Sequence, residues 1–374
     1  MDHRKELFDW KEPYDTAGTS DLFIQTMRDC CRFHYDNCPE YQRILDAADF
    51  RPEELKEEED LERLPFLPTV FLKKHHLFSM PLNRLPIKAT SSGTGGRYSK
   101  IGFDAGGLAG AFKMVIRVFS KLGLLSPVPC HYIIFGFKPH RSNHTAVAKT
   151  ATGYTLLTPA LSRTYALKYE NGKYEPDLEG TVKAFQKSAG SAFPTRTIGF
   201  PSYTWFALKL MEEKGMAVKL PKGSKIMLAG GWKQFYKEQV DKHEMYALAE
   251  KILGIGEEDI VEAYGAVEHP ILYCDCKKHH FHVPIYSRVI IRDVETLKPV
   301  ENGKLGLVNL ITPMFRGTPI LSIMTDDLGI LHDAKECGCG IDSPWFEIIG
   351  RAGFVDIKTC AAGAAEMLKG GTGK

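Results

Sequence analysis

The sequence contains no long apolar run, no large excess of either charge and no internal repeat. No stretch approaches the roughly 20 consecutive apolar residues that a membrane-spanning helix needs. The 48 basic and 46 acidic residues leave a formal net charge of +2, which gives no electrostatic basis for binding nucleic acid or a membrane surface. The first residues lack the apolar stretch of a signal peptide. We therefore expect a cytoplasmic protein without a membrane span and without a nucleic-acid partner.

The composition is typical of a globular protein with a large core. Of the 374 residues, 44% are hydrophobic and 25% are charged, so one large domain or two ordinary ones can form. The cytoplasm keeps thiols reduced, so the nine cysteines are not expected to form disulfides.

Apolar periodicity predicts an α/β architecture. Residues 1–64 have helical spacing, and between residues 104 and 266 helical stretches alternate with short apolar strands. Such alternation implies a parallel sheet in layers with helices. After residue 270, short strands separated by turn residues predict a β-rich part.

The individual elements follow from the same patterns. An apolar stripe at helical spacing predicts one helix through Leu108, Phe112, Val115, Phe119 and Leu122. The other expected helices are 177–188, 203–214 and 234–252. The expected strands of the alternating part are 131–135, 196–200, 225–229 and 259–264. Those of the β-rich part are 271–276, 281–292, 304–311, 319–325 and 345–350.

A run of small residues between two expected strands is the most informative segment. It comprises Ser91, Ser92, Gly93, Thr94, Gly95 and Gly96, and is followed by Arg97 and Lys100. The backbone N–H groups of such a loop can surround a phosphate while hydroxyls donate and cations neutralise. It differs from the G-x-x-x-x-G-K-[ST] loop because a strand, and not a helix, comes next. An ordinary turn is the alternative.

A second pattern stands at the end of the strand expected over 259–264. Tyr264 and Gly265 are followed by Glu268. Ligands of open α/β sheets bind beyond the carboxyl ends of strands, where an aromatic ring can stack on a base and a carboxylate can hold a magnesium ion. An ordinary strand and turn is the alternative.

Two further patterns lie in the β-rich part. Asp326 and Asp327 are expected at a strand end, where carboxylates can bind sugar hydroxyls, with a solvated turn as the alternative. Arg351 follows a strand and a glycine, where it can meet a phosphate or a ribose. A surface salt bridge is the alternative for this arginine.

Two Cys-x-Cys pairs form a candidate metal site. They are Cys274 with Cys276, and Cys337 with Cys339. Strand alternation would put both cysteines of a pair on one face, so that four thiolates could surround a zinc ion. His282 is the competing fourth ligand, and His279 and His280 are weaker candidates. Free thiols without a metal are the alternative.

The order of these patterns along the chain resembles that of the adenylate-forming enzymes, the superfamily of acyl-CoA synthetases. The turn at Gly230 and Gly231 strengthens the resemblance, which covers roughly residues 65–360. The segments Phe200-Pro-Ser-Tyr, Gly230-Gly-Trp-Lys and Tyr264-Gly-Ala-Val-Glu-His most resemble the acyl-protein synthetases of bacterial fatty acid reductase complexes.

The resemblance implies a fold and a set of roles. The fold is α/β, a large adenylate-forming domain over 1–350 with mixed sheets flanked by helices. Its parts are a helical 1–64, an α/β 65–270 and a β-rich 271–350, followed by a short flexible segment over 351–374. The loop Ser91 to Gly96 would hold the phosphates of ATP, with Arg97 or Lys100 as the cation. Gly230 and Gly231 would lie beside adenine, and Tyr264 and Gly265 would flank it. Glu268 would coordinate Mg²⁺. Asp327 and Arg351 would bind the ribose and phosphate side.

The C-terminal segment departs from the superfamily. The superfamily usually adds a lid of about a hundred residues, and this sequence ends 23 residues after Arg351, so we expect a truncated lid. The acyl-protein synthetases carry an acyl-accepting cysteine near the C-terminus, which corresponds to Cys360. A thiolate readily attacks an acyl-adenylate, and the nearby Lys358 would lower the thiol pKa. An incidental cysteine is the alternative.

The leading hypothesis is therefore an AMP-forming ligase that activates a long-chain fatty acid and transfers it to Cys360 for a partner acyl reductase, with an acyltransferase as a further partner. Related aryl-CoA ligases have a Cys/His zinc site in this region, which implies a structural Zn²⁺ here. An acyl- or aryl-CoA ligase and a non-catalytic nucleotide-binding scaffold are the competing hypotheses. Acyl chain length, oligomeric state and the partner's identity are not readable from the sequence.

Overall fold

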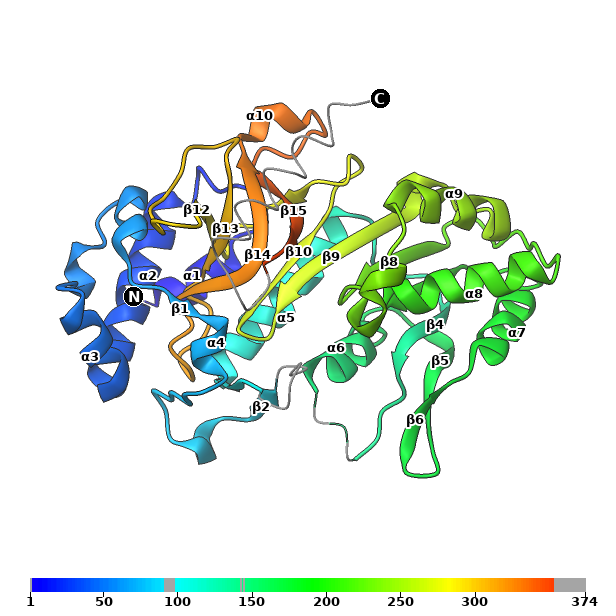
Figure 1. Cartoon of the computed structure of the whole chain (residues 1–374), viewed down its shortest axis with the longest axis horizontal. Helices are drawn as coiled ribbons and strands as arrows, with labels where there is room; N and C mark the ends of the chain where they lie inside the picture. Colours follow the sequence, from blue (N-terminus) through cyan, green and yellow to red (C-terminus); the bar gives the residue numbers. More distant parts are fainter. Residues whose placement is uncertain (1, 91–97, 142, 144, 353–374) are drawn as a thin grey trace. The chain divides into compact units, whose positions relative to one another are not determined.

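The computed structural model describes residues 2–90, 98–141, 143 and 145–352 (Figure 1). The chain divides into two compact units. The first comprises Met1–Arg117, Ala266–Tyr273 and His280–Lys374, and the second comprises Val118–Gly265 and Cys274–His279. Among the described residues, no helix has both the length and the apolar character needed to cross a membrane.

The first unit begins with helices, as the periodicity of residues 1–64 predicts. They are α1 (His3–Asp9), α2 (Ser20–Asn37) and α3 (Pro39–Ala47), followed by the 3₁₀ turns η1 (Pro52–Glu54) and η2 (Glu58–Arg63). The Asp2 side chain accepts a hydrogen bond from the Lys5 N–H and so caps α1. Pro39 stands in the first turn of α3, where its fixed φ favours the start of a helix.

The β-rich part of the first unit is a mostly antiparallel sheet in the order β11-β15-β14-β13-β12. The strands are β11 (Phe281–His282), β12 (Arg288–Arg292), β13 (Leu305–Ile311), β14 (Ser322–His332) and β15 (Trp345–Arg351), and the short β1 (Leu67–Pro68) pairs in parallel with β14. The expected strand end at Asp326 and Asp327 is wrong, because β14 continues for five residues beyond them. The strand pairs with β13 and β15 along this extension, so its ladder does not stop at the two carboxylates.

A separate hairpin of β2 (Ile87–Thr90) and β3 (Lys100–Phe103) precedes α5 (Ala105–Lys121), as predicted. The short helix α4 (Thr69–Leu72) and the turn η3 (Leu82–Arg84) lie between β1 and the hairpin. The predicted stripe of α5 is wrong at Phe112, which is 58% exposed. The buried face runs through Gly107, Gly110, Met114 and Val118. A Cβ at Gly107 would collide with the Phe315 ring, and one at Gly110 with the Phe8 ring.

The second unit contains a largely parallel sheet in the order β9-β8-β7-β4-β5-β6. Its strands are β4 (Cys130–Phe137), β5 (Ala160–Glu170), β6 (Lys173–Pro176), β7 (Thr195–Gly199), β8 (Lys225–Ala229) and β9 (Ile260–Ala266). The four strands predicted in this region are confirmed. The β5–β6 hairpin was not predicted, although its turn residues Asn171 and Gly172 both have positive φ, as a two-residue Asn-Gly hairpin turn requires.

Helices α7 (Leu178–Ala189), α8 (Pro201–Glu213) and α9 (Lys242–Leu253) share a core with this sheet (Figure 1). The core includes Phe135, Phe185 and Leu208, all fully buried. Helix α6 (Ala146–Tyr154) contacts β4. The helix predicted over 234–252 starts later than expected. The 3₁₀ turn η4 (Lys233–Glu238) comes first, and Asp241 then caps α9 by accepting from the His243 N–H. A second 3₁₀ turn, η5 (Glu257–Asp259), leads into β9.

Two buried histidines of the first unit predict a pH-dependent stability. His34 bonds to the Ser79 hydroxyl at 2.6 Å and to the Phe315 carbonyl at 3.1 Å, and His269 bonds to the Tyr273 hydroxyl at 2.8 Å. Burial lowers the pKa of both imidazoles to about 3. Below pH ~6.5 the two imidazoles are protonated in the unfolded chain but stay neutral in the folded protein. Their contribution to the free energy of unfolding is therefore complete above that pH and is lost as the pH falls toward 3. The loss is up to about 1.4 kcal/mol per pH unit for each histidine.

Urea unfolding at pH 7.5, 6.0 and 5.0 checks this expectation. The free energy of unfolding should fall below pH 6.5, and His269→Gln should make that fall shallower. Replacement of the exposed His75 by Gln is the control and should leave the slope as in the wild type. A stability that does not change between pH 7.5 and 5.0 would contradict the assignment of neutral buried imidazoles.

Candidate functional site

The segment predicted to hold phosphates stands in the sequence between β2 and β3, which form a hairpin. Ser91, Ser92, Gly93, Thr94, Gly95, Gly96 and Arg97 are outside the described residues. The strands at both ends are paired in register, with Thr90 opposite Lys100. The exposed Lys100 ammonium lies 5.9 Å from the centroid of the Tyr98 ring. The strand–loop–strand arrangement predicted for this segment is therefore confirmed at both flanks.

Glu268 lies in the turn between β9 and β10 (His269–Cys274) and is only 5% exposed. Its Oε1 accepts a hydrogen bond from the Ser99 hydroxyl at 2.5 Å. Ser99 itself is completely buried and stands one residue before β3. Ser99 is not among the residues predicted from the sequence, because a serine beside a glycine-rich loop carries no signal that distinguishes it from its neighbours.

Asp327 and Arg351 face each other on neighbouring strands. They are register partners of β14 and β15, and the Arg351 Nε lies 4.0 Å from the Asp327 Oδ1. The Arg351 Nη2 also donates to the Asp326 Oδ2 at 3.3 Å, and Asp326 accepts from the Thr69 hydroxyl at 3.2 Å. The arginine side chain is 61% exposed, so this ion pair adds little to stability and leaves the guanidinium accessible to an anion.

The remaining nucleotide-site candidates lie at one edge of the sheet in the second unit. Gly230 and Gly231 directly follow β8 and have φ of 84° and 67°, a region that favours glycine. Tyr264 and Gly265 belong to the last residues of β9. Strands β8 and β9 are parallel, with Ala229 opposite Ala263. The two pairs of residues are therefore neighbours at the carboxyl edge, where ligands of such sheets bind.

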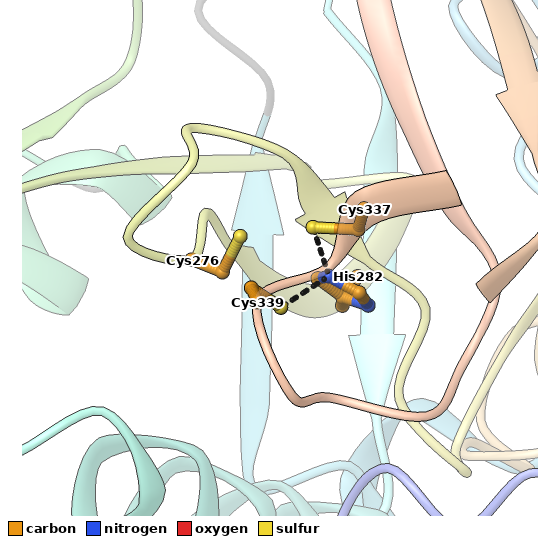
Figure 2. A group of neighbouring side chains, drawn as sticks. All are labelled: Cys276, His282, Cys337 and Cys339. Carbon is orange, nitrogen blue, oxygen red and sulfur yellow. Dashed lines mark hydrogen bonds between the residues drawn. The ribbon is translucent and has the colours of Figure 1, made fainter. Parts of the chain in front are cut away.

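Four side chains form a group with the composition of a zinc site (Figure 2). They are Cys276, His282, Cys337 and Cys339, and their ligand atoms all lie within 4.8 Å of one another. The His282 Nε2 is 3.3 Å from the Cys337 sulfur and 3.2 Å from the Cys339 sulfur. Three thiolates and one imidazole are a common tetrahedral set for structural zinc.

The surroundings of this group orient it for metal binding. The His282 Nδ1 lies 2.9 Å from the Ser343 carbonyl oxygen. A proton on Nδ1 donates to that carbonyl and leaves the Nε2 lone pair facing the thiols. Burial lowers the pKa of His282 to about 4, which keeps the ring neutral. Backbone N–H groups of Lys278 and Ile341 donate to the sulfurs of Cys276 and Cys339, an arrangement that stabilises thiolates.

Cys274 does not belong to this group, which corrects the expected pairing of two Cys-x-Cys motifs. Strand β10 ends at Cys274, and the chain turns after Asp275, so the alternation of strand side chains does not extend to Cys276. Burial raises the pKa of the Cys274 thiol well above its ordinary value. His280 approaches the Cys337 sulfur at 3.1 Å and stacks on Trp345. His279 instead bonds to Asp275 at 2.6 Å.

The overall fold is that of the adenylate-forming ligases. An open conformation of 2-hydroxyisobutyryl-CoA ligase, solved with 2-HIB-AMP and CoA, matches with a TM-score of 0.68 at 15% identity, over 91% of this chain and 71% of that one. The predicted fold class is thereby confirmed.

The sequence then specifies the family. The sequence model of the acyl-protein synthetases (LuxE) matches residues 8–369, and the chain belongs to this family. It is a ligase, as its relatives' names also indicate.

Named relatives of two kinds are similar to the chain. A long-chain-fatty-acid–luciferin-component ligase of Aliivibrio fischeri is 24% identical over 356 residues, 92% of this chain and 88% of the relative. A ligase of the same name from Vibrio harveyi is 22% identical, over 93% of this chain and 88% of the relative. A phenylacetate-coenzyme A ligase of Thermus thermophilus is 25% identical over 317 residues, 81% of this chain and 64% of the relative.

Proposed function

We propose that the protein activates a long-chain fatty acid with ATP and then carries the acyl group on its own Cys360. The observation that carries this proposal is the family match over residues 8–369, together with similarity to two long-chain-fatty-acid ligases along nearly their whole length. In the first step a carboxylate oxygen attacks the α-phosphorus of ATP, and the bond to the β,γ-phosphates breaks. The products are acyl-AMP and pyrophosphate.

Different residues would bind the phosphates, the metal ion, the ribose and the adenine of the nucleotide. The loop from Ser91 to Gly96 would hold the phosphates through its N–H groups, with Arg97 or Lys100 neutralising them. Glu268 would hold Mg²⁺, because a buried carboxylate with one oxygen already oriented suits this hard cation. When bound, Mg²⁺ would neutralise charge on the phosphates. Asp327 and Arg351 would bind the ribose and phosphate side, and Gly230, Gly231, Tyr264 and Gly265 would bind adenine.

The state of the other cysteines supports Cys360 as the acyl acceptor. Of the nine cysteines, three belong to the metal group and five have a thiol pKa raised mainly by burial; these five are Cys30, Cys31, Cys38, Cys130 and Cys274. Raised pKa values suppress the thiolate, which is the nucleophile. The ninth is Cys360, which lies outside the described residues. Its thiolate would attack the acyl carbonyl of acyl-AMP, expelling AMP and forming a thioester for a partner acyl reductase, with an acyltransferase as a further partner.

We also propose that Cys276, His282, Cys337 and Cys339 hold a structural zinc ion. The protein supplies a complete set of four ligands, which leaves no open position for catalysis. The ion would join the segment after β10 to the loop after the short helix α10 (Ala334–Cys337).

An acyl- or aryl-CoA ligase is the second candidate function, favoured by the similarity to phenylacetate-coenzyme A ligases. It shares the adenylation step and differs in the acceptor, which would be the thiol of CoA. Both functions therefore give acyl-AMP first. The second product is a protein thioester in the first function and acyl-CoA in the second.

Pyrophosphate release across aliphatic and aryl acids, measured without CoA, tests the proposed function. We expect release with long-chain fatty acids, and we expect Glu268→Gln to lower the rate by about 100-fold, because it removes an anionic metal ligand. Glu257→Gln, on an exposed carboxylate of the second unit, is the matched control. Release only with aryl acids, or turnover only after CoA is added, would support the second candidate instead.

A further inference from the structure

The hydrogen bond between Ser99 and Glu268 connects the base of the phosphate-loop hairpin to the carboxylate expected to hold Mg²⁺. Both side chains are at least 95% buried, and the O–O distance is 2.5 Å, which is typical of a charge-assisted hydrogen bond to a carboxylate. Ser99 directly precedes β3, which is paired in register with β2. The hydroxyl thus links the Glu268 carboxylate to the residue directly before β3.

The backbone beside Glu268 is fixed independently. His269 is fully buried and bonds to the Tyr273 hydroxyl at 2.8 Å, and Tyr273 bonds in turn to the Ser287 hydroxyl. The next residue is thus anchored in the core, while the Glu268 side chain reaches Ser99. Since the backbone is held by His269, the remaining freedom of Glu268 is in its side-chain torsions, and Ser99 restricts these.

We propose that Ser99 is a positioning residue that orients the Glu268 carboxylate for the divalent cation bound with ATP. This inference rests on the proposed function, in which Glu268 holds that cation. Ser99 itself is not a metal ligand in this scheme. It fixes the rotamer in which Glu268 presents its second oxygen, so that metal binding does not have to order the side chain.

Metal binding and activity are measured separately for wild type, Ser99→Ala and Ser99→Thr. Mn²⁺ binding to the enzyme with α,β-methylene-ATP is followed by the electron paramagnetic resonance of free Mn²⁺, without any acid substrate. Ser99→Ala should weaken Mn²⁺ binding about tenfold, the size expected for loss of one hydrogen bond to a charged group. Ser99→Thr keeps the hydroxyl and should stay within about twofold of wild type. The same shift should appear in the Mg²⁺ concentration that half-saturates pyrophosphate release.

A structural role alone would give a different result. Ser79→Ala is the matched control, since Ser79 is a buried serine of the same unit that bonds to His34 at 2.6 Å. It should lower the melting temperature without changing Mn²⁺ affinity. If Ser99→Ala behaves like Ser79→Ala, or if Ser99→Thr fails to restore binding, the positioning role is wrong. If wild type releases no pyrophosphate with any acid but Ser99→Ala still weakens Mn²⁺ binding, the proposed function fails and the role of Ser99 stands.

Discussion

Loss of a metal ion from the group of Cys276, His282, Cys337 and Cys339 is expected to lower the melting temperature by about 6 °C. Structural zinc contributes directly to folding free energy, and a loss of about 5 kcal/mol corresponds to roughly 6 °C in a chain of this size, at about 2.1 cal/mol/K of unfolding entropy per residue. Without the ion, three thiols and a partly desolvated imidazole are left facing one another. The group is largely buried, with only Cys339 of intermediate exposure, so water replaces the lost ligand bonds poorly.

The measurement combines metal analysis with thermal unfolding. Purified wild type should contain about one zinc per chain, and Cys337→Ala should contain none and melt at the lower temperature. Cys274→Ala is a closely matched control, because Cys274 is equally buried, precedes Cys276 by two residues and is not a member of the group. It should keep its zinc. Equal zinc loss in both variants, or a wild type that melts identically before and after complete chelation, would refute the site.

Replacing Cys360 with Ser is expected to abolish covalent acyl labelling while leaving pyrophosphate release in the first turnover intact. In the proposed mechanism adenylation precedes the attack of the thiol, so the first product would not require Cys360. A serine hydroxyl without an adjacent base is a far weaker nucleophile than a thiolate toward a mixed anhydride. The acyl group should therefore remain as acyl-AMP on the enzyme and should not appear on the protein.

Single-turnover mixing with radiolabelled long-chain fatty acid and ATP, followed by denaturing electrophoresis, distinguishes the outcomes. Wild type should be labelled, and neutral hydroxylamine should remove the label, because thioesters are cleaved under those conditions. Cys130→Ser, which alters a buried thiol with a raised pKa, should be labelled like wild type. Labelling of Cys360→Ser at the wild-type level would exclude Cys360 as the carrier.

Local patterns predicted the elements well where side chains of one type repeat. The parallel strands of the second unit are short apolar runs, and the hairpin around the small-residue loop follows from two strands separated by glycines. The buried face of α5 was misassigned because Gly107 and Gly110 contribute to it without any hydrophobic side chain. Their role depends on Phe8 and Phe315, which are remote in sequence and fill the space that a Cβ would occupy.

In the candidate site, too, some residues can be selected from the sequence and others only from the structure. Asp327 and Arg351 could each be selected from the sequence as polar residues near strands. Their pairing could not be predicted, because β14 continues past the carboxylates and the register between β14 and β15 makes the two residues face each other. Ser99 could not be selected, since its role depends on Glu268, which lies 169 residues away in the chain.

By itself the sequence determined the class of fold, the position of the β2–β3 hairpin and the residue types available for metal and nucleotide binding, because these depend on local periodicity and on the chemistry of single side chains. Tertiary structure alone decided that Cys276, and not Cys274, joins His282, Cys337 and Cys339, and that Ser99 holds Glu268. Both outcomes depend on the distance between segments remote in sequence. Such distances are set by the packing of the core and by the turn after β10, which no local pattern records.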